Sequence, residues 1–337
     1  MKNVVHVGPF SSRGGMSSVI QTLSDNPPDG WSSGIIDTYS GKGIFSKAKA
    51  WLKARMEVKR LALEGSIDIA HIHVTHSLSW WRKRDIMQLC DKIGIKVLVH
   101  IHSGKFDKFC RGLAGKSVKE EMNKENRKVV VLENRWLEIL DEWLPKNSSV
   151  VPNSIDLRKI EPRRDGLSSE LKILMLSRKD SIKGHRFALD THRILSNRGI
   201  KCRLIISGVN EEEIRGKKHE GVEVIGWVSE KEKWKLLGEV DFVLSPSEFE
   251  GSSMTVIESI TSGVPCICSL TSAETIGIDA LTLDLNDPNE WANKIVELSN
   301  PRAYREIENL LRKQKDRFDI KNINYHWNEI YDNLVLK

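Results

Sequence analysis

The sequence predicts two tandem doubly wound α/β domains, and three observations lead to that prediction. Short β-branched runs alternate with longer helical patterns in the first half of the chain. Several of these runs are almost continuously apolar, as in strands buried on both faces of a parallel sheet. After a break near residues 156–170, the same alternation starts again. Alternating strands and helices are typical of a doubly wound parallel sheet.

The first domain is expected over residues 1–155. One of its helices, Gly43–Leu63, is indicated by Phe45, Ala48, Leu52, Met56 and Leu63 at helical spacing. Its strands are predicted at Val4–Val7, Ile35–Tyr39, Ile67–Val74, Lys96–Ile101, Lys128–Leu132 and Ser149–Val151.

A linker is expected over residues 156–170, where a proline, a glycine, paired serines and many charges occur together. The second domain is expected over 171–318, and Ser229-x-x-Glu232 is a capping box that opens one of its helices. The last residues, 319–337, are predicted to be helical. The strands of the second domain are predicted at Leu171–Leu176, Arg203–Ser207, Val222–Ile225, Phe242–Leu244 and Pro265–Cys268, and the helices at the end of the chain at Trp291–Leu298, Ala303–Phe318 and Tyr325–Val335.

The composition is that of a globular protein of 337 residues, with 39% apolar residues and 23 glycines. No apolar run approaches the ~18 residues that a membrane span requires, and the N-terminus lacks the layout of a signal peptide. Five cysteines without paired spacing fit reduced thiols better than a disulfide framework. We therefore expect a cytoplasmic protein.

The net positive charge is confined to the first half of the chain. Residues 1–155 hold 24 Lys and Arg against 16 Asp and Glu, a net +8, whereas the remainder holds 28 against 30, a net −2. Such asymmetry concerns partners and not the fold. An anionic membrane surface, a phosphorylated substrate and nucleic acid are all compatible with it.

The strongest local signals lie in SEFEGSSMTVIESITSGVPCICS, residues 247–269. Small residues at a predicted helix start leave its N–H groups open to phosphate, and the helix dipole favours that negative charge. Glu250 precedes this start, and Glu258 lies about one and a half turns inside the helix. Carboxylates accept hydrogen bonds from vicinal hydroxyls. The order of hydroxyls, phosphate and hydroxyls is that of a nucleotide sugar, with phosphate facing the amides of Ser252, Ser253 and Met254.

These residues resemble the retaining glycosyltransferases of family 4 (group 1), which have the GT-B fold. The Glu-x7-Glu motif stands here as Pro246-Ser247, Glu250-Gly251, Glu258, Gly263 and Pro265. Other similar segments, in order, are GGM (14–16), VPNSID (151–156), SRKDSIKG (177–184), GWVSEKE (from Gly226) and the C-terminal INYHWNEIYDNL. The chain departs from the family pattern at Ser252-Ser253, often Phe-Gly, and at Ser154, usually Gly.

The resemblance implies two Rossmann-like domains facing a cleft, with the C-terminal helix crossing back to pack on the first domain. It assigns Arg178 and Lys183 to the donor diphosphate, where their charge would stabilise the leaving nucleoside diphosphate. It assigns Glu250 to the sugar hydroxyls and Glu258 to the ribose.

The resemblance also implies donor contacts from the glycine-rich turn and from the loop beside the base. The amide of Gly15 is expected to approach the donor phosphate, and Gly226 and Val228 to lie beside the nucleotide base. His102, after the strand Lys96–Ile101, matches the family's histidine near the transferred sugar.

Histidines also raise the question of a metal site. His71 and His73 share one face of a strand, but His76 falls on the other parity or in a loop. No acidic or cysteine ligand is adjacent, so we expect no metal site and expect His73 to line the cleft.

Two segments suggest contact with a membrane. Residues Lys42 to Arg60 hold seven Lys and Arg and one acid on an amphipathic helix, and SLSWWRKRD (77–85) places two tryptophans beside three basic residues. Solvated helix faces have this composition too. Basic residues with aromatic neighbours also suit the inner, anionic face of a membrane.

The function we expect is retaining transfer of a sugar from a UDP- or GDP-sugar to a glycan or lipid-linked acceptor, in cell-surface polysaccharide or glycolipid synthesis. The absence of an Asp-x-Asp motif predicts no obligatory metal, and we expect no other cofactor. A nucleotide-sugar epimerase and a non-catalytic sugar-nucleotide-binding subunit are the alternatives. A dinucleotide oxidoreductase is disfavoured because no G-x-G-x-x-G follows the first strand. Nucleic-acid binding would leave the Glu-x7-Glu segment without a purpose.

Overall fold

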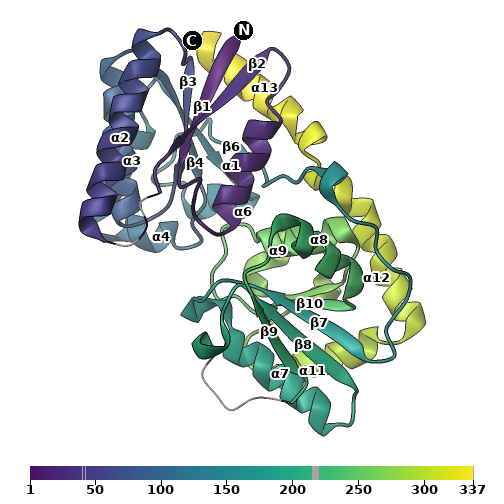
Figure 1. The fold of residues 1–337 in the computed structure, drawn as a ribbon. Helices are drawn as coiled ribbons and strands as arrows, with labels where there is room; N and C mark the ends of the chain where they lie inside the picture. Colours follow the sequence, from purple (N-terminus) through teal and green to yellow (C-terminus); the bar gives the residue numbers. More distant parts are fainter. Residues whose placement is uncertain (40, 42, 215–219, 337) are drawn as a thin grey trace. The chain divides into compact units, whose positions relative to one another are not determined.

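A computed structural model describes residues 1–39, 41, 43–214 and 220–336 (Figure 1). The chain divides into two compact units, of which the first is Met1–Ile155 with Ile320–Lys337 and the second is Asp156–Asp319. In the described part of the chain, each unit holds a six-stranded sheet, and all the strand pairs are parallel. The predicted doubly wound α/β architecture is therefore confirmed for each unit.

The sheet of the first unit has the strand order β2-β1-β3-β4-β5-β6. Its strands are β1 (Lys2–Gly8), β2 (Trp31–Asp37), β3 (Ile69–Val74), β4 (Lys96–Ile101), β5 (Arg127–Val131) and β6 (Ser149–Val150). Its helices are α1 (Gly15–Asp25), α2 (Ile44–Leu63), α3 (Leu78–Lys92), α4 (Phe106–Phe109), α5 (Gly115–Met122), α6 (Asn134–Ile139) and the C-terminal α13 (Ile320–Leu336).

The two faces of this sheet differ in chemistry. One face packs against α2, α3 and α5 in an apolar core that includes Val58, Ile86 and Val118. The other face is covered by α1 and α13, which Figure 1 shows on the opposite side of the sheet from α2 and α3. Histidines line this second face, and Trp327 and Tyr331 of α13 lie against them.

The sheet of the second unit has the strand order β12-β11-β10-β7-β8-β9. Its strands are β7 (Leu171–Leu176), β8 (Cys202–Ser207), β9 (Val222–Gly226), β10 (Phe242–Ser245), β11 (Cys266–Ser269) and β12 (Thr282–Leu283). Its helices are α7 (His185–Asn197), α8 (Glu230–Glu239), α9 (Met254–Ser262), α10 (Ala273–Ile276), α11 (Pro288–Leu298) and α12 (Pro301–Gln314).

Local signals located most elements, and the predicted capping box at Ser229 and Glu232 is present. The second strand begins at Trp31 and not at Ile35, because parallel pairing with β1 runs over seven positions and includes the weakly β-forming Ser32, Ser33 and Gly34. The last helix begins at Ile320. This is one residue after the start of the segment 319–337 predicted to be helical, and five residues before the helical pattern at Tyr325–Val335.

Residues 156–170, expected as a linker, are counted in the second unit. The Arg164 guanidinium and the Ser168 amide both donate to the buried carboxylate of Asp241. This part of the segment is therefore tied to the second sheet.

The apolar stripe that indicated α2 lies on the solvent side of that helix. Phe45, Leu52, Met56 and Leu63 are 93%, 50%, 64% and 90% exposed. The side that packs in the core carries Ala54 and Val58 instead. The spacing therefore predicted the helix correctly but did not indicate which of its faces is buried.

Candidate functional site

Two loops meet at the carboxyl edge of the second sheet, where α/β proteins bind ligands. One follows β7 (residues 177–184) and the other follows β10 (residues 246–253). The Glu248 amide donates to the Ile182 carbonyl at 2.8 Å. Gly184 has φ +72°, and a Cβ added there would lie 2.2 Å from the Pro246 carbonyl oxygen. Glycine is therefore required for the close approach of the two loops.

An ion pair joins the same two loops. The Lys183 Nζ lies 2.6 Å from Glu250 Oε1, and the two side chains are 20% and 12% exposed. Arg178 begins the first loop with a side chain 62% exposed, and its guanidinium is 4.0 Å from Asp180. The structure thus brings three predicted site residues to one edge of one sheet: a lysine–glutamate pair and a solvent-facing arginine.

The helix α9 begins at Met254, shortly after Glu250 of this pair. Ser253 is the N-cap, and its hydroxyl accepts from the Val256 amide at 3.4 Å. The Thr255 hydroxyl donates to the Leu176 carbonyl at 3.0 Å, which ties the first turn of α9 to the end of β7. Ser252 and Ser253 are buried and Met254 is partly exposed. The helix N-terminus predicted to face phosphate is therefore fixed at the carboxyl edge.

Glu258 has a partner that the sequence did not reveal. Its carboxylate is buried and lies 2.6 Å from Lys233 Nζ of α8, which also pairs with Glu230 at 2.8 Å. Burial raises the pKa of Glu258, and the Lys233 charge opposes this shift. Burial acts to lower the pKa of Lys233, but Glu258 and Glu230 outweigh it, so that this pKa is raised. A carboxylate predicted to bind ribose thus holds an ammonium group in this structure.

Gly226 and Val228 stand at the end of β9, at the same carboxyl edge. Gly226 has φ +67°, and its carbonyl accepts from the Gly208 amide at 2.7 Å and the Ser207 hydroxyl at 2.9 Å. Val228 is partly exposed and directly precedes Ser229, the N-cap of α8. These contacts hold the loop between β9 and α8 against the end of β8.

Gly15 and His102 belong to the first unit, whereas the other predicted site residues belong to the second. Gly15 is the first residue of α1, after the β1 strand, and His102 directly follows β4. Both therefore lie at the carboxyl edge of the first sheet. His102 is partly exposed, and its Nε2 lies 2.9 Å from His73 Nδ1.

His71 and His73 of β3 lie against three further histidines, which are His6 of β1, His100 of β4 and His102 directly after β4. His6 Nδ1 lies 3.2 Å from His73 Nε2, and His71 Nε2 lies 3.1 Å from His100 Nδ1. His76 lies outside this cluster and is bonded to the Ser103 hydroxyl at 2.6 Å. His73, expected to line a cleft, is instead fully buried. Sequence reasoning missed His6 because only the pairing of β1 with β3 brings it to His71 and His73.

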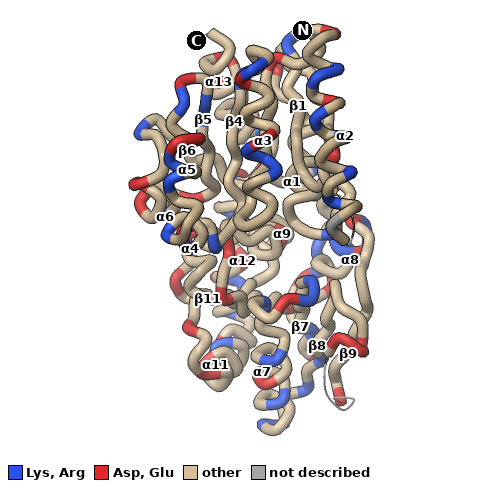
Figure 2. Tube along the Cα trace, turned by 90° about the vertical axis from the view of Figure 1, so that its left-hand side faces the viewer, with Lys and Arg blue, Asp and Glu red and all other residues tan. Residues whose placement is uncertain are grey.

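The second segment predicted for membrane contact is partly buried. Trp80 is fully buried, and Lys83 is 3% exposed and donates to the Val7 carbonyl and the Thr38 hydroxyl at 3.0 and 2.8 Å. Burial lowers the pKa of Lys83 well below its usual value. Trp81 remains exposed, and Arg82 is partly exposed. In the first segment, Figure 2 shows basic positions along α2. Lys49, Lys53, Lys59 and Arg60 are exposed, Lys47 and Arg55 are partly exposed, and Lys42 lies outside the described residues.

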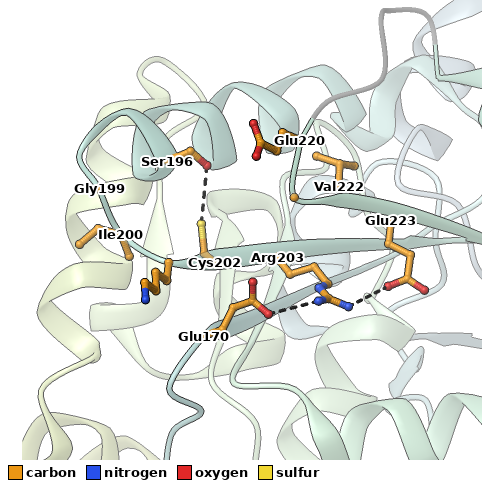
Figure 3. A pocket seen from close by; sticks show the side chains of 11 residues that line it. Glu170, Ser196, Gly199, Ile200, Cys202, Arg203, Glu220, Val222 and Glu223 are labelled. Carbon is orange, nitrogen blue, oxygen red and sulfur yellow. Dashed lines mark hydrogen bonds and ion pairs between the residues drawn. The ribbon is translucent and has the colours of Figure 1, made fainter.

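A hollow at the opposite, amino edge of the second sheet has different chemistry (Figure 3). It is lined by Glu170, Lys201, Arg203, Glu223 and residues around Cys202. Arg203 lies between Glu170 and Glu223, at 3.3 and 3.6 Å. None of the predicted site residues lines it, so the candidate site remains at the carboxyl edge.

The sequence of the second unit matches a known family. Residues 170–300 match the family model for glycosyl transferases group 1. This segment, which is less than half of the chain, resembles a group 1 glycosyltransferase domain. It contains the Lys183–Glu250 pair and the start of α9, whereas Gly15 and His102 lie outside the matched residues.

Comparisons with individual proteins extend this result. EpsF of Bacillus subtilis, named as a glycosyltransferase, is 29% identical over 166 residues, which are 43% of this chain and 43% of EpsF. The match therefore spans less than half of that relative.

Solved structures match nearly the whole chain. Sucrose-phosphate synthase from Thermosynechococcus elongatus has a TM-score of 0.79 at 15% identity, with 99% of both chains covered. Anabaena HepE, solved with UDP-glucose, has a TM-score of 0.75 at 13% identity, covering 99% of this chain and 100% of HepE. These likenesses confirm the predicted GT-B fold class.

Among the described residues, no helix is both long and apolar enough to span a bilayer.

Proposed function

We propose that the chain is a retaining glycosyltransferase of the family 4 type, which transfers a sugar from a UDP- or GDP-sugar to a glycan or lipid-linked acceptor. The observation that carries the proposal is the Lys183–Glu250 pair at the carboxyl edge of the glycosyltransferase domain. The pair joins the basic loop after β7 to the loop after β10, in which the Glu-x7-Glu motif begins.

The donor is assigned to residues of the second unit. Arg178 and Lys183 bind the diphosphate, where their charges stabilise the leaving nucleoside diphosphate. The amides of Ser252, Ser253 and Met254 at the start of α9 support the phosphate. When phosphate draws Lys183 away, the Glu250 carboxylate becomes able to accept from sugar hydroxyls.

Glu258 is assigned to the ribose through the carboxylate oxygen that does not hold Lys233. Lys233 opposes the rise in pKa that burial causes at this carboxylate, and an ionised carboxylate is the stronger acceptor for hydroxyls. Gly226 and Val228 border the base. Gly15 and His102 of the first unit remain proposed donor and catalytic residues. The reaction is proposed to need no metal.

The first test measures donor binding through thermal unfolding of the protein in the presence of a panel of UDP- and GDP-sugars. A bound donor raises the melting temperature by mass action. Losing one charged contact costs about 1.5–3 kcal/mol, so Lys183→Ala is expected to weaken binding by about 10- to 100-fold. Lys179→Ala is the matched control, because Lys179 stands in the same loop with a side chain 63% exposed and pairs with Glu213 at 3.8 Å.

The second readout is release of nucleoside diphosphate with acceptor present, in EDTA, with the product anomer determined by NMR. Retention of configuration and activity in EDTA are expected. Full transfer by both Lys183→Ala and Glu250→Ala would overturn the site. Product formed without an acceptor would indicate an epimerase, and donor binding without nucleotide release under any acceptor would indicate a non-catalytic subunit.

We also propose a cytoplasmic protein that contacts the anionic inner face of the membrane through the exposed stripe of α2. Phe45, Leu52, Met56 and Leu63 lie along one side of this helix. The exposed Lys49, Lys53 and Lys59 flank them. An apolar stripe bordered by lysines suits an interface between acyl chains and anionic headgroups.

Sedimentation with phosphatidylglycerol vesicles tests this contact, with phosphatidylcholine vesicles for comparison. Each large apolar side chain contributes about 1.5–3 kcal/mol when buried, so Leu52→Ser with Met56→Ser should weaken binding at least tenfold. Leu310→Ser, at an apolar residue of α12 that is 42% exposed, should leave it unchanged. Equal binding of the wild type and the double variant would contradict the contact.

A further inference from the structure

The histidine face of the first sheet contains two hydrogen-bonded rows. The first row is His6–His73–His102, joined by contacts of 3.2 Å (His6 Nδ1 to His73 Nε2) and 2.9 Å (His73 Nδ1 to His102 Nε2). The second row is Tyr331–His71–His100, joined at 2.8 Å and 3.1 Å. The first row ends at the predicted catalytic histidine.

A metal ion is a poorer explanation of this cluster than hydrogen bonding. The groups whose nitrogens are close enough to share an ion, His6–His71–His73 and His73–His100–His102, consist of histidines alone. The His71 and His73 rings are stacked 4.4 Å apart with their planes within 10°. Parallel rings cannot direct their in-plane lone pairs at one ion, which argues against an ion shared by His71 and His73. In the second group, His73 Nδ1 and His102 Nε2 are 2.9 Å apart, which is a hydrogen-bond distance. A buried dication would also have no anionic ligand among these residues.

Burial makes the rows neutral. It lowers the pKa of His6 and of His102 to about 3, and that of His73 well below the usual value. A neutral imidazole carries one N–H and one bare nitrogen. Both nitrogens of His73 are engaged, so His73 must donate to one neighbour and accept from the other.

This requirement leaves two proton arrangements for the first row. In one, His6, His73 and His102 all carry the proton on Nδ1, and His102 offers an N–H donor at its outer nitrogen. In the other, all three carry it on Nε2, and the outer Nδ1 of His102 is an acceptor. Converting the first arrangement into the second takes up a proton at His6 Nε2 and releases one from His102 Nδ1. Within the row, one proton moves from His6 to His73 and another from His73 to His102.

We propose that His6 and His73 are positioning residues that couple the tautomer of His102 to their own. In this tautomer lock, the outer nitrogen of His102 is a donor when all three rings carry the proton on Nδ1 and an acceptor when all three carry it on Nε2. The consequence for catalysis rests on the proposed function, in which His102 acts at the transferred sugar. The lock itself does not depend on activity.

The test is NMR of the full chain with ¹⁵N-labelled histidine, in which two-bond couplings between ring nitrogens and carbon-bound protons report each tautomer. We expect His6, His73 and His102 to show the same tautomer. His6→Phe keeps a ring but removes the nitrogen that holds His73, and should change the tautomer populations of His102. His6→Asn provides an amide that can donate or accept, and should restore the wild-type pattern.

Tyr331→Phe is the matched control, because it removes a hydrogen bond from the second row on the same sheet face. It should leave the His102 signals unchanged. Unlike tautomers within the first row, or His102 signals that do not respond to His6→Phe in the folded protein, would overturn the lock. Loss of the ring N–H signals on addition of Zn²⁺ would instead establish a metal site and overturn it too.

Kinetics separate this inference from the proposed function. If the chain transfers sugar, His6→Phe should lower kcat severalfold with little change in the KM for donor, and His6→Asn should recover it. A locked tautomer in a protein without transferase activity would refute the function and keep the lock. Full transferase activity in a protein whose first row shows mixed tautomers would refute the lock and keep the proposed function.

Discussion

Single side chains decide the electrostatics of the donor site. Lys233 and Glu258 form a buried pair, and a buried pair is costly to break although it adds little net stability when intact. Glu258 was predicted as a ligand-binding residue from its spacing to Glu250. Its cation comes from α8, at a sequence separation of 25 residues.

Lys233→Met is expected to destabilise the second unit, because it leaves the Glu258 carboxylate buried without its cation. Removing one member of a buried pair costs about 3–5 kcal/mol. The double variant Lys233→Met with Glu258→Gln should regain most of this loss, since neither charge remains. Urea unfolding of the three proteins measures the difference. Equal stability of the single variant and the wild type would contradict the pairing.

The donor site depends on close contacts between the loops at the carboxyl edge of the second sheet. Local chemistry predicted the loops after β7 and β10, but not that they touch. That contact depends on Gly184, whose φ is +72°.

Gly184→Ala should separate these loops. A Cβ at a positive φ costs about 1 kcal/mol, and the contact with the Pro246 carbonyl should add about 1–3 kcal/mol. Gly199→Ala is the control, since Gly199 has φ +75° and a Cβ there meets no described atom within 4 Å. Both variants should lose stability in thermal unfolding, but Gly184→Ala alone should lose the stabilisation by nucleotide sugar.

The helix α2 marks the limit of periodicity as evidence. Its apolar residues repeat at helical spacing, which predicts a helix whether the repeat faces a core or solvent. The core side uses Ala54 and Val58, since small residues allow close packing with α3 and the sheet.

Across the whole chain, the histidines make the two units respond differently to acid. Burial lowers the pKa of five histidines well below 6.5 in the first unit, namely His6, His71, His73, His100 and His102. The unfolded chain therefore binds more protons below about pH 6.5, and stability falls as the pH decreases.

The first unit should accordingly lose about 4 kcal/mol between about pH 7.5 and pH 6, from five histidines at just under about 1 kcal/mol each. The second unit is the internal control. Burial also lowers the pKa of His185 there, so this unit should lose some stability but less than the first. Hydrogen exchange by mass spectrometry, corrected for the intrinsic effect of pH, should show β3 and β4 losing more protection than β7 and β10. Equal loss in both units would contradict this prediction.

The sequence alone determined the α/β class, most strands and helices, and the loops that carry the Glu-x7-Glu motif. These features follow from apolar periodicity, caps and turn residues, which act over a few neighbouring positions. Only the tertiary structure decided that Lys183 meets Glu250 and that His6 meets His73, each across 67 residues. Strand order and parallel register create such contacts, and no local pattern in the chain encodes which side chains they bring together.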